Sequence, residues 1–338
     1  MGKWKYEKQI TIGHDTDGKP VRTRVRANTK AELEQKTAEA RQKGKEKPVN
    51  AVAFGVYSEN WYTLYKSTKE AATREMYRNA LRKMSSLKDV PVKDLTASDL
   101  QKIISDNAGH PSTCTKILLT MRQICALAVS EGILSSDISK CLEAPSVCVK
   151  QGRALTDEEK TAIREADLDP MQRLYVGLLY YLGLRPQEAL ALKPEDFNGD
   201  TVTIQRAVGY DMNRPYIKVT KTGNVRTLPV PRELKELLLR TEAKTYLIHH
   251  NGELMSKTVK SDFWVKIQRV IREKLGKETD IRPYTFRHNY CTMCYYSGLS
   301  LKKCVYLMGH HSYRMVMEVY AHLDDEKESL DVLKNISL

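Results

Sequence analysis

Apolar residues recur at helical spacing through residues 51–145. The segment SENWYTLYKSTKEAATREMYRNALRKMSSL contains no glycine or proline, and STCTKILLTMRQICALAVSEG forms a second long run that ends at Gly132. Between them, TASDLQKIISD begins with Thr96, and Asp99 stands where a capping box places an acidic side chain. Apolar residues three and four positions apart form one face of a helix, so the pattern predicts an all-helical unit.

The first 50 residues instead contain alternating segments that are typical of strands. KYEKQITIG and KPVRTRVRA flank HDTDG, in which Asp17 and Gly18 form a hairpin turn signal. Successive residues of a strand point to opposite faces, so the second strand presents a row of three guanidiniums on one face. That row consists of Arg22, Arg24 and Arg26.

Capping signals mark the helices on either side of the helical unit. Thr29 and Glu32 have capping-box spacing after the hairpin, and GKEKPVN then has the composition of a linker. A second linker, APSVCVKQGR, precedes LTDEEK, where Thr156 and Glu159 open a third unit. Helical patterns dominate this unit, except that DTVTIQRAV, PYIKVT and VRTLPV predict three short strands within residues 200–230. The chain is therefore predicted to be mainly α with small β-sheets.

Length and charge narrow the function. A chain of 338 residues is too long for one ordinary core, so two or three domains are expected. The formal net charge is +13, and the first 50 residues contain 13 Lys and Arg against 7 Asp and Glu. A surplus of this size favours a polyanionic partner, nucleic acid before membrane, over a merely soluble basic protein. The arginine row is accordingly interpreted as a DNA-binding face rather than a solvated strand face.

Membrane, export and metal signals are missing from the sequence. It has no run of 18 apolar residues, and its start, MGKWKYEKQITIG, lacks the apolar stretch of an export signal. The seven scattered cysteines are therefore expected to be reduced thiols in a bacterial cytoplasmic protein. Cys291 and Cys294 form a lone CxxC near His288, but a structural zinc site requires four ligands. No metal, cofactor or membrane contact is predicted.

Four stretches of the third unit carry side chains suited to phosphate chemistry. YYLGLRPQEALAL places Arg185 after a Gly-Leu break and before a helix that contains Glu188, and VTKTGNVRTLPV places Lys221 at a strand tip. RPYTFRHNY and MGHHSYRMVMEVY supply the others, which are Arg287, His310 and Tyr320. Each stretch alone is more often structural, for example a surface ion pair between Arg185 and Glu188.

Together and in this order, the stretches resemble the catalytic domain of the tyrosine recombinases, the phage-integrase family. The resemblance covers roughly residues 155–325. Arg185 in GLRPQEALAL matches the first arginine of the family, with Glu188 as its usual acidic neighbour, and Lys221 in KTGNVRTLP matches the lysine of the β-hairpin. Arg287 in YTFRH matches the second arginine, His310 in MGH matches the histidine before the nucleophile, and Tyr320 in MEVYAHL matches the nucleophile itself.

The resemblance implies three domains. Residues 1–50 look like an arm-type DNA-binding module of integrases from temperate phages and conjugative elements, built from a β-hairpin and a helix. Residues 51–148 look like the helical, SAM-like core-binding domain. Residues 149–338 look like the α+β catalytic domain. The implied partners are double-stranded DNA with core-type and arm-type attachment sites, a homotetramer on DNA, an excisionase and a host DNA-bending protein.

The implied reaction is a transesterification that integrates or excises a mobile element through a covalent 3′-phosphotyrosine. Arg185 and Arg287 would clamp the non-bridging oxygens, His310 would add a donor, Lys221 would protonate the leaving 5′-oxygen and Tyr320 would attack phosphorus. Such a reaction needs neither metal nor ATP. Glu188 is placed to orient the guanidinium one turn before it rather than to act as a base.

One position departs from the family pattern. The family usually has histidine three residues before its second arginine, and this chain has Tyr284. A phenol donates a hydrogen bond to phosphate but accepts a proton poorly near neutral pH, so lower activity or another proton path is expected. His288, one residue beyond Arg287, does not fill the gap and is predicted to pack in a helix.

Two alternatives remain open, and both share the DNA partner. One is a non-catalytic DNA-binding regulator derived from a recombinase, which the Tyr284 substitution alone supports. The other is a nicking-closing enzyme like the type IB topoisomerases, which would relax DNA without exchanging partners. The C-terminal segment also leaves a choice between packing in cis and in trans on a neighbouring subunit. Its apolar stripe consists of Leu330, Leu333, Ile336 and Leu338.

Overall fold

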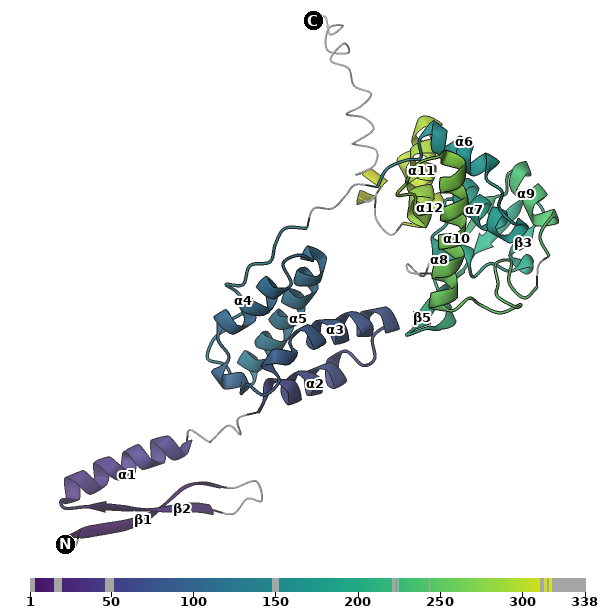
Figure 1. Cartoon of the computed structure of the whole chain (residues 1–338). Helices are drawn as coiled ribbons and strands as arrows, with labels where there is room; N and C mark the ends of the chain where they lie inside the picture. Colours follow the sequence, from purple (N-terminus) through teal and green to yellow (C-terminus); the bar gives the residue numbers. More distant parts are fainter. Residues whose placement is uncertain are drawn as a thin grey trace, which may run out of the picture. The chain divides into compact units, whose positions relative to one another are not determined.

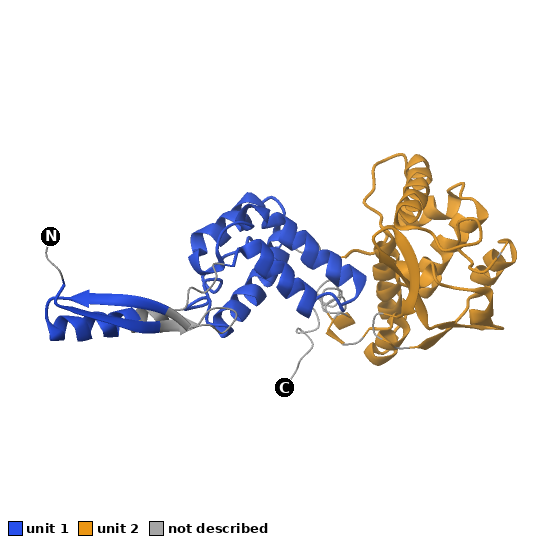
Figure 2. Ribbon diagram, turned by 90° about the horizontal axis from the view of Figure 1, so that it is seen from below, with its two compact units in different colours: residues 1–147 blue, residues 148–338 orange. Residues whose placement is uncertain are grey.

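The computed structural model describes residues 4–14, 20–45, 52–147, 152–220, 223, 225–242, 244–310, 313–314 and 316–317. The chain divides into two compact units, residues 1–147 and 148–338 (Figure 2). Each unit has its own buried apolar side chains. The turn predicted at Asp17-Gly18, both predicted linker centres, Lys221, Tyr320 and the C-terminal stripe lie outside the described residues.

The N-terminal segment of the first unit is a β-hairpin followed by a helix (Figure 1). Strands β1 (Tyr6–His14) and β2 (Pro20–Ala27) pair antiparallel, with an irregularity between Thr11 and Gly13, and helix α1 (Lys30–Lys45) packs against both. The predicted alternation holds, because Val25 and Ala27 are buried while the three arginines of β2 are exposed. The Thr29 side chain accepts from the backbone of Glu32, as the capping pattern predicts.

The rest of the first unit is a helical bundle of α2 (Phe54–Tyr65), α3 (Ala71–Lys83), α4 (Ala97–Asp106) and α5 (Pro111–Ser130). Two 3₁₀ turns, η1 (Ser85–Leu87) and η2 (Val92–Asp94), join α3 to α4. Trp61 on α2 meets Tyr77 on α3 edge to face, above a core that α5 completes with Ile117 and Met121. The run without glycine or proline is not one helix, since the chain turns at residues 66–70 so that α2 and α3 share this core.

The second unit is built mainly of helices around a buried central one. Helix α7 (Pro170–Leu182) contributes Leu174, Leu178, Leu179 and Leu182 to the core, all at most 1% exposed. Helix α11 (Pro283–Tyr296) packs on α7 and on α12 (Leu301–Met308). The remaining helical elements are α6 (Asp157–Glu165), α8 (Pro186–Ala189), η3 (Pro194–Asp196), α9 (Arg232–Leu239) and α10 (Lys257–Leu275).

Two small antiparallel sheets lie beside these helices. One has the order β3-β4-β7, from β3 (Phe197–Asn198), β4 (Thr201–Ile204) and β7 (Arg226–Pro229), and the other pairs β5 (Arg206–Asp211) with β6 (Arg214–Val219). The strand predicted as DTVTIQRAV is therefore two strands in different sheets. The break falls at Gln205, whose amide donates to Asp196 Oδ1 at 3.1 Å. The predicted fold class, mainly α with small sheets, is confirmed.

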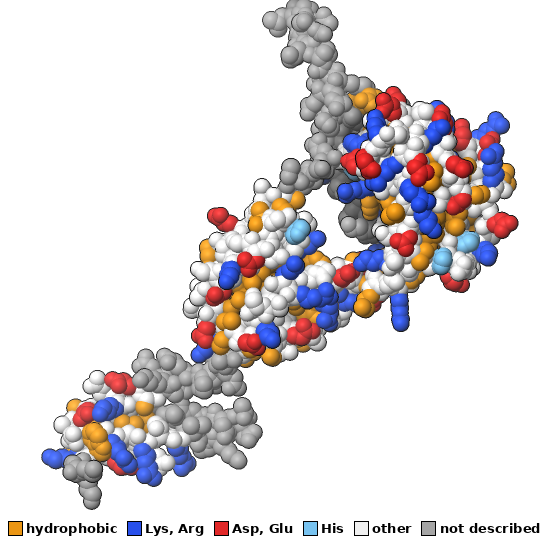
Figure 3. Space-filling model, viewed as in Figure 1, with side chains coloured by type: hydrophobic (Ala, Val, Ile, Leu, Met, Phe, Trp, Pro, Cys, Tyr) orange, Lys and Arg blue, Asp and Glu red, His pale blue; other side chains and the backbone are white. Residues whose placement is uncertain are grey.

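Charged side chains are scattered over the visible surface of the described residues, among hydrophobic and other side chains (Figure 3). Lys and Arg are spread over both units, with Asp and Glu among them (Figure 3). Among the described residues, no helix combines the length and the apolar character that spanning a membrane would require.

Candidate active site

A glycine turn begins the site. Helix α7 ends at Gly183, whose φ of 59° lies in the left-handed region. A Cβ there would stand 2.4 Å from the Tyr290 ring on α11, so glycine satisfies both the backbone conformation and the close approach. The turn places Arg185 directly before α8, with Pro186 as the first residue of the helix. The sequence GLRP thus fixes where the Arg185 side chain starts.

Arg185 is held from two sides. Its Nη1 donates to Glu188 Oε1 at 2.7 Å, and its backbone N–H donates to Glu188 Oε2 at 3.0 Å. Its Nη2 donates to the carbonyl of Gly309 at 2.7 Å, just after α12. The side chain is 14% exposed. Glu188 therefore orients this guanidinium, in the role that the sequence assigned to it.

Arg287 lies deeper than Arg185, on the second turn of α11. Its Nη1 donates to the Gly183 carbonyl at 2.8 Å, and its Nη2 donates to the Met308 carbonyl. The residue is 5% exposed. Burial, followed by the charge of Arg185, lowers the pKa of Arg287 to about 9. The guanidinium therefore keeps its charge at neutral pH, because its pKa still lies above 7.

His310 follows α12 directly. Gly309 ends the helix with a φ of 61°, and the His310 backbone N–H donates to the Val305 carbonyl at 3.1 Å. Burial, followed by the charges of Arg287 and Arg185, lowers the pKa of His310 to about 3. The ring is thus neutral at pH 7, with one N–H donor and one lone pair. Its Nδ1 is buried and has no hydrogen-bond partner within the described part of the chain.

The structure adds a third guanidinium, which the sequence reasoning missed. Arg226, the first residue of β7, is only 2% exposed. Its Nη2 donates to Glu188 Oε2 at 2.7 Å, its Nη1 to Glu188 Oε1 at 3.3 Å and its Nε to the Leu307 carbonyl at 3.0 Å. Arg226 lies on the same face of β7 as the buried Leu228, so alternation along VRTLPV was the available signal.

Glu188 is the negative centre of this arrangement and is 1% exposed. Burial raises the pKa of its carboxyl, but the hydrogen bond and charge of Arg226, followed by the charges of Arg185 and Arg287, lower it to about 2. Within the described residues, one carboxylate therefore faces three guanidiniums, an excess of two positive charges. Such a cluster, with neutral His310 beside it, is suited to binding an anion with several oxygens, such as a phosphodiester.

The structure brings four of the sequence-predicted residues together, namely Arg185, Glu188, Arg287 and His310. Tyr284 lies one turn before Arg287 on α11 and is 48% exposed. His288 is partly buried, and burial lowers its pKa. Its ring fills the space where a Cβ of Gly152 would stand, which agrees with the predicted packing role.

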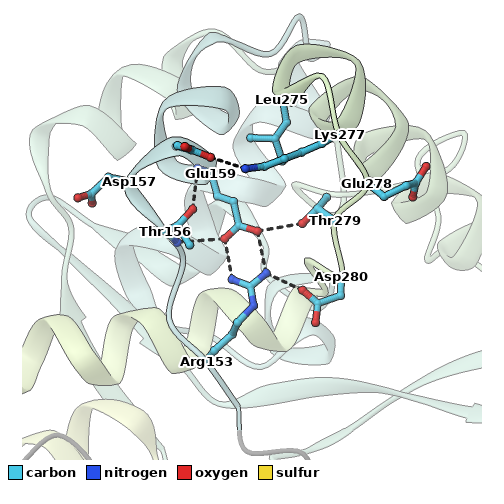
Figure 4. Close-up of a pocket in the computed structure, with 10 residues that line it drawn as sticks. Arg153, Thr156, Asp157, Glu159, Leu275, Lys277, Glu278, Thr279 and Asp280 are labelled. Atoms are coloured by element: carbon cyan, nitrogen blue, oxygen red, sulfur yellow. Dashed lines mark hydrogen bonds and ion pairs between the residues drawn. The ribbon is translucent and has the colours of Figure 1, made fainter. Parts of the chain in front are cut away.

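A second polar cluster in this unit joins the segment before α6 to the segment after α10, and we call it the clasp. Arg153 donates to both oxygens of Glu159 at 2.7 Å and to Asp280 at 2.5 Å, while the Thr279 hydroxyl donates to Glu159 at 2.9 Å (Figure 4). These residues border a groove between α6 and the segment after α10, whose other lining residues include Lys277 and Glu278. The clasp contains one guanidinium and two carboxylates, so it adds no positive charge to the anion cluster and instead ties the start of the unit to the segment after α10.

This fold and site define the class of protein, a tyrosine site-specific recombinase. The chain belongs to the phage integrase family, because the model of that family matches residues 151–327, about half of the chain. The predicted family is thereby confirmed.

Relatives of known sequence agree with this membership. A protein named "Tyrosine recombinase XerC-like" from Caldanaerobacter subterraneus subsp. tengcongensis is 24% identical over 95% of this chain and 93% of its own length. Tyrosine recombinase XerA of Pyrococcus furiosus is 27% identical over 71% of this chain and 83% of its own length.

Solved structures share the fold at low sequence identity. The Tn1549 transposon integrase in complex with transposon right-end DNA superimposes with a TM-score of 0.67 and 16% identity, over 82% of this chain and 98% of that one. A lambda integrase tetramer bound to a Holliday junction gives a TM-score of 0.66 and 16% identity, over 88% of this chain and 92% of that one.

Proposed function

We propose that this recombinase is an integrase that cuts and rejoins DNA at the attachment sites of a mobile element. The observation that carries the proposal is the convergence of Arg185, Arg287 and His310 around the end of α12, with an excess of two positive charges among the described residues. The scissile phosphodiester would lie against these groups. Both guanidiniums would bind its non-bridging oxygens, which gain negative charge in the transition state, and the neutral His310 ring would donate its N–H.

The reaction proposed for this site exchanges one phosphodiester for another. The Tyr320 hydroxyl loses its proton to solvent, and its oxygen attacks phosphorus and forms a new P–O bond, while the bond from phosphorus to the 5′-oxygen breaks. Lys221, five residues before Arg226, gives its proton to the leaving oxygen. The 3′-phosphotyrosine retains the bond energy, so attack by another 5′-hydroxyl reseals DNA and releases Tyr320. Tyr284 would donate its phenol hydrogen to a phosphate oxygen and replace the usual histidine only in that part of its role.

The proposed partners follow from the domain division. Residues 1–50 would bind arm-type sites through the exposed arginine face of β2, residues 51–148 would bind the core site, and residues 149–338 would carry out catalysis. We propose a homotetramer on DNA, as in the lambda integrase structure with a Holliday junction, together with an excisionase and a host DNA-bending protein. The place of action would be the bacterial cytoplasm, on the nucleoid.

A recombinase of the Xer kind is the second candidate, and the names of the sequence relatives favour it. The N-terminal hairpin with its arginine face favours an integrase, because a second DNA-binding surface allows one protein to bridge separate sites. Repeats in the DNA that flanks the gene would supply the test sites. Recombination between two such repeats on plasmids supports the mobile-element assignment, whereas recombination only at a chromosomal site that does not border an element supports the second candidate.

The first prediction tests the nucleophile. The wild-type protein should form a covalent adduct with a nicked attachment-site duplex that cannot be religated. Tyr320→Phe should abolish the adduct, because it removes the attacking oxygen, while Tyr313→Phe in the same segment should retain it. Denaturing gels with labelled DNA measure the adduct. If no variant or condition gives an adduct, a non-catalytic regulator is supported, and relaxation of arbitrary supercoiled DNA would support the topoisomerase-like alternative.

A further inference from the structure

Three arginines from three separate elements bind three consecutive backbone carbonyls. Arg226 on β7 donates to Leu307, Arg287 on α11 donates to Met308, and Arg185 at the start of α8 donates to Gly309. These carbonyls end α12, and the last carbonyls of a helix have no partner within it. They also form the negative end of the helix dipole, which cations stabilise. All three arginines of the cluster are thus attached to the same helix end.

Arg226 differs from the other two arginines in how its donors are used. Its Nε is taken by Leu307, and both terminal nitrogens face the oxygens of Glu188. The side chain is 2% exposed and Glu188 is 1% exposed. A group so enclosed does not reach DNA. It acts on groups that do, because Glu188 also receives Arg185 and because Leu307 lies three residues before His310.

The strand that carries Arg226 comes shortly after the predicted lysine position along the chain. Residue 226 follows Lys221 by five positions, and the next backbone N–H, that of Thr227, donates to the Tyr306 hydroxyl on α12 at 3.2 Å. β7 and α12 pack against each other. Side-chain and backbone contacts therefore both fasten β7, the strand that carries Arg226, to α12.

We propose that Arg226 is a positioning residue for strand transfer, which fixes Glu188 and the end of α12 so that Arg185 and His310 keep one mutual arrangement. This inference rests on the proposed function. A planar guanidinium with donors in a fixed fork serves a carboxylate and a carbonyl at once, whereas an ammonium is a single point of charge. Lysine at this position would retain the positive charge but could not bind both the Glu188 carboxylate and the Leu307 carbonyl in the same way.

The matched control is Arg206 on β5. It is also an arginine of a short strand in this unit, its side chain is 17% exposed, and its Nη2 donates at 2.7 Å to Asp196, which is 1% exposed. Its ion pairs are with Asp196 and Glu195, neither of which belongs to the anion cluster or to α12. Replacing Arg206 therefore breaks a comparable ion pair without touching the anion cluster.

The experiment measures single-turnover cleavage of the nicked duplex, DNA affinity and thermal unfolding for Arg226→Lys, Arg226→Ala, Arg206→Lys and Arg206→Ala. Arg226→Lys should bind DNA as the wild type does but cleave about 100-fold more slowly, the scale expected for misplaced reacting groups. Millimolar guanidinium ions should restore part of the cleavage by Arg226→Ala, because they can occupy the vacated space. The Arg206 variants should cleave at nearly the wild-type rate and show no such rescue.

A pH profile adds a readout that lost stability alone would not change. The described charged groups that face Glu188 are Arg185, Arg226 and Arg287, whose positive charges lower its pKa, while burial raises it. Removal of Arg226 takes away one of these positive charges, so the pKa of Glu188 should rise. The acid limb of cleavage should then move toward neutral pH in Arg226→Ala and stay in place in Arg206→Ala.

Two outcomes overturn the inference. One is wild-type cleavage by Arg226→Lys, and the other is a loss of cleavage that follows the unfolded fraction equally in the Arg226 and Arg206 variants. Either result leaves the proposed function intact as long as the wild type forms its Tyr320-dependent adduct. A wild type that forms no adduct overturns the proposed function, and the inference with it.

Discussion

At the scale of single residues, the site contains more buried positive charges than negative ones. Among the described residues, the single carboxylate of Glu188 faces three guanidiniums, so the cluster keeps an excess of positive charge. The sequence indicated Arg185, Arg287 and His310 because each stands in a stretch that resembles a family motif, namely GLRP, YTFRH and MGH. No motif pointed to Arg226. The alternation in its four-residue strand predicts that the side chain is buried but does not predict which carboxylate it meets.

A pH prediction belongs to His310. Its pKa is about 3 in the folded chain and about 6.5 when unfolded, so the unfolded state binds one more proton between those values. Stability should therefore fall as pH drops below 6.5. The slope is at most about 1.4 kcal/mol per pH unit and smaller in practice, because solvent screens a partly exposed ring. Glu188 contributes little above pH 6, where it is ionised in the folded state and almost fully ionised in the unfolded state.

Thermal unfolding between pH 5 and 7 measures this effect. His310→Asn should have a flatter dependence of the melting temperature on pH than the wild type. His288→Asn is the matched control, since burial also lowers the pKa of His288 and its removal should flatten the curve to a lesser extent. Equal slopes in the wild type and His310→Asn would contradict the buried neutral state of this ring.

At the scale of elements, the sequence predicted which segments are helical better than where they break. Capping boxes at Thr96 and Thr156 form as predicted, since both partners of each box are close in sequence. The turn at residues 66–70 and the division of DTVTIQRAV at Gln205 carry no local signal. They arise because α2 and α3 share one core and because β4 and β5 pair with strands of different sheets.

Gly309 offers a prediction about the end of α12. Its φ is 61°, and a Cβ would stand 2.8 Å from Arg226 Nη1. Gly276 ends α10 with a φ of 70° but has open space around it. Gly276→Ala should lose about 1 kcal/mol of stability from backbone strain alone. Gly309→Ala should lose more and also cleave more slowly, because it displaces Arg226.

Chemical denaturation and single-turnover cleavage separate these two glycine variants. The difference between their unfolding free energies reports the close approach to Arg226, since the backbone strain is common to both. The prediction fails if Gly309→Ala and Gly276→Ala lose equal stability and Gly309→Ala cleaves at the wild-type rate. That result would mean that the Arg226 guanidinium can move aside without affecting the site.

At the scale of the whole molecule, the chain consists of two compact units, and the described residues of the anion cluster lie within residues 148–338. The arginine face of β2 lies in the other unit. Its arginines are exposed, and Arg24 and Arg26 form surface ion pairs with Glu7 at 3.6 and 3.0 Å. Surface pairs of this kind are weak, so they leave the guanidiniums available to phosphates.

The N-terminal prediction follows from that separation. Deletion of residues 1–50 should leave cleavage of the core site intact but impair integration between two DNA molecules. Replacement of Arg22, Arg24 and Arg26 by Gln should weaken binding to arm-type DNA. It should reduce the slope of log affinity against log salt by about 0.9 for each phosphate that is no longer neutralised, and so by about three at most. A deletion that changes neither DNA affinity nor integration would remove the arm-binding assignment.

The end of α12 has a consequence for how this protein tolerates variation. The acceptors for its three arginines are main-chain oxygens, which every amino acid possesses. Leu307 and Met308 can therefore change their side chains without loss of the anchoring bonds, provided that the apolar core still accommodates them. Point mutation therefore cannot remove these acceptors, although a Cβ at Gly309 would crowd Arg226, and the donors are three arginines that lie far apart in the sequence.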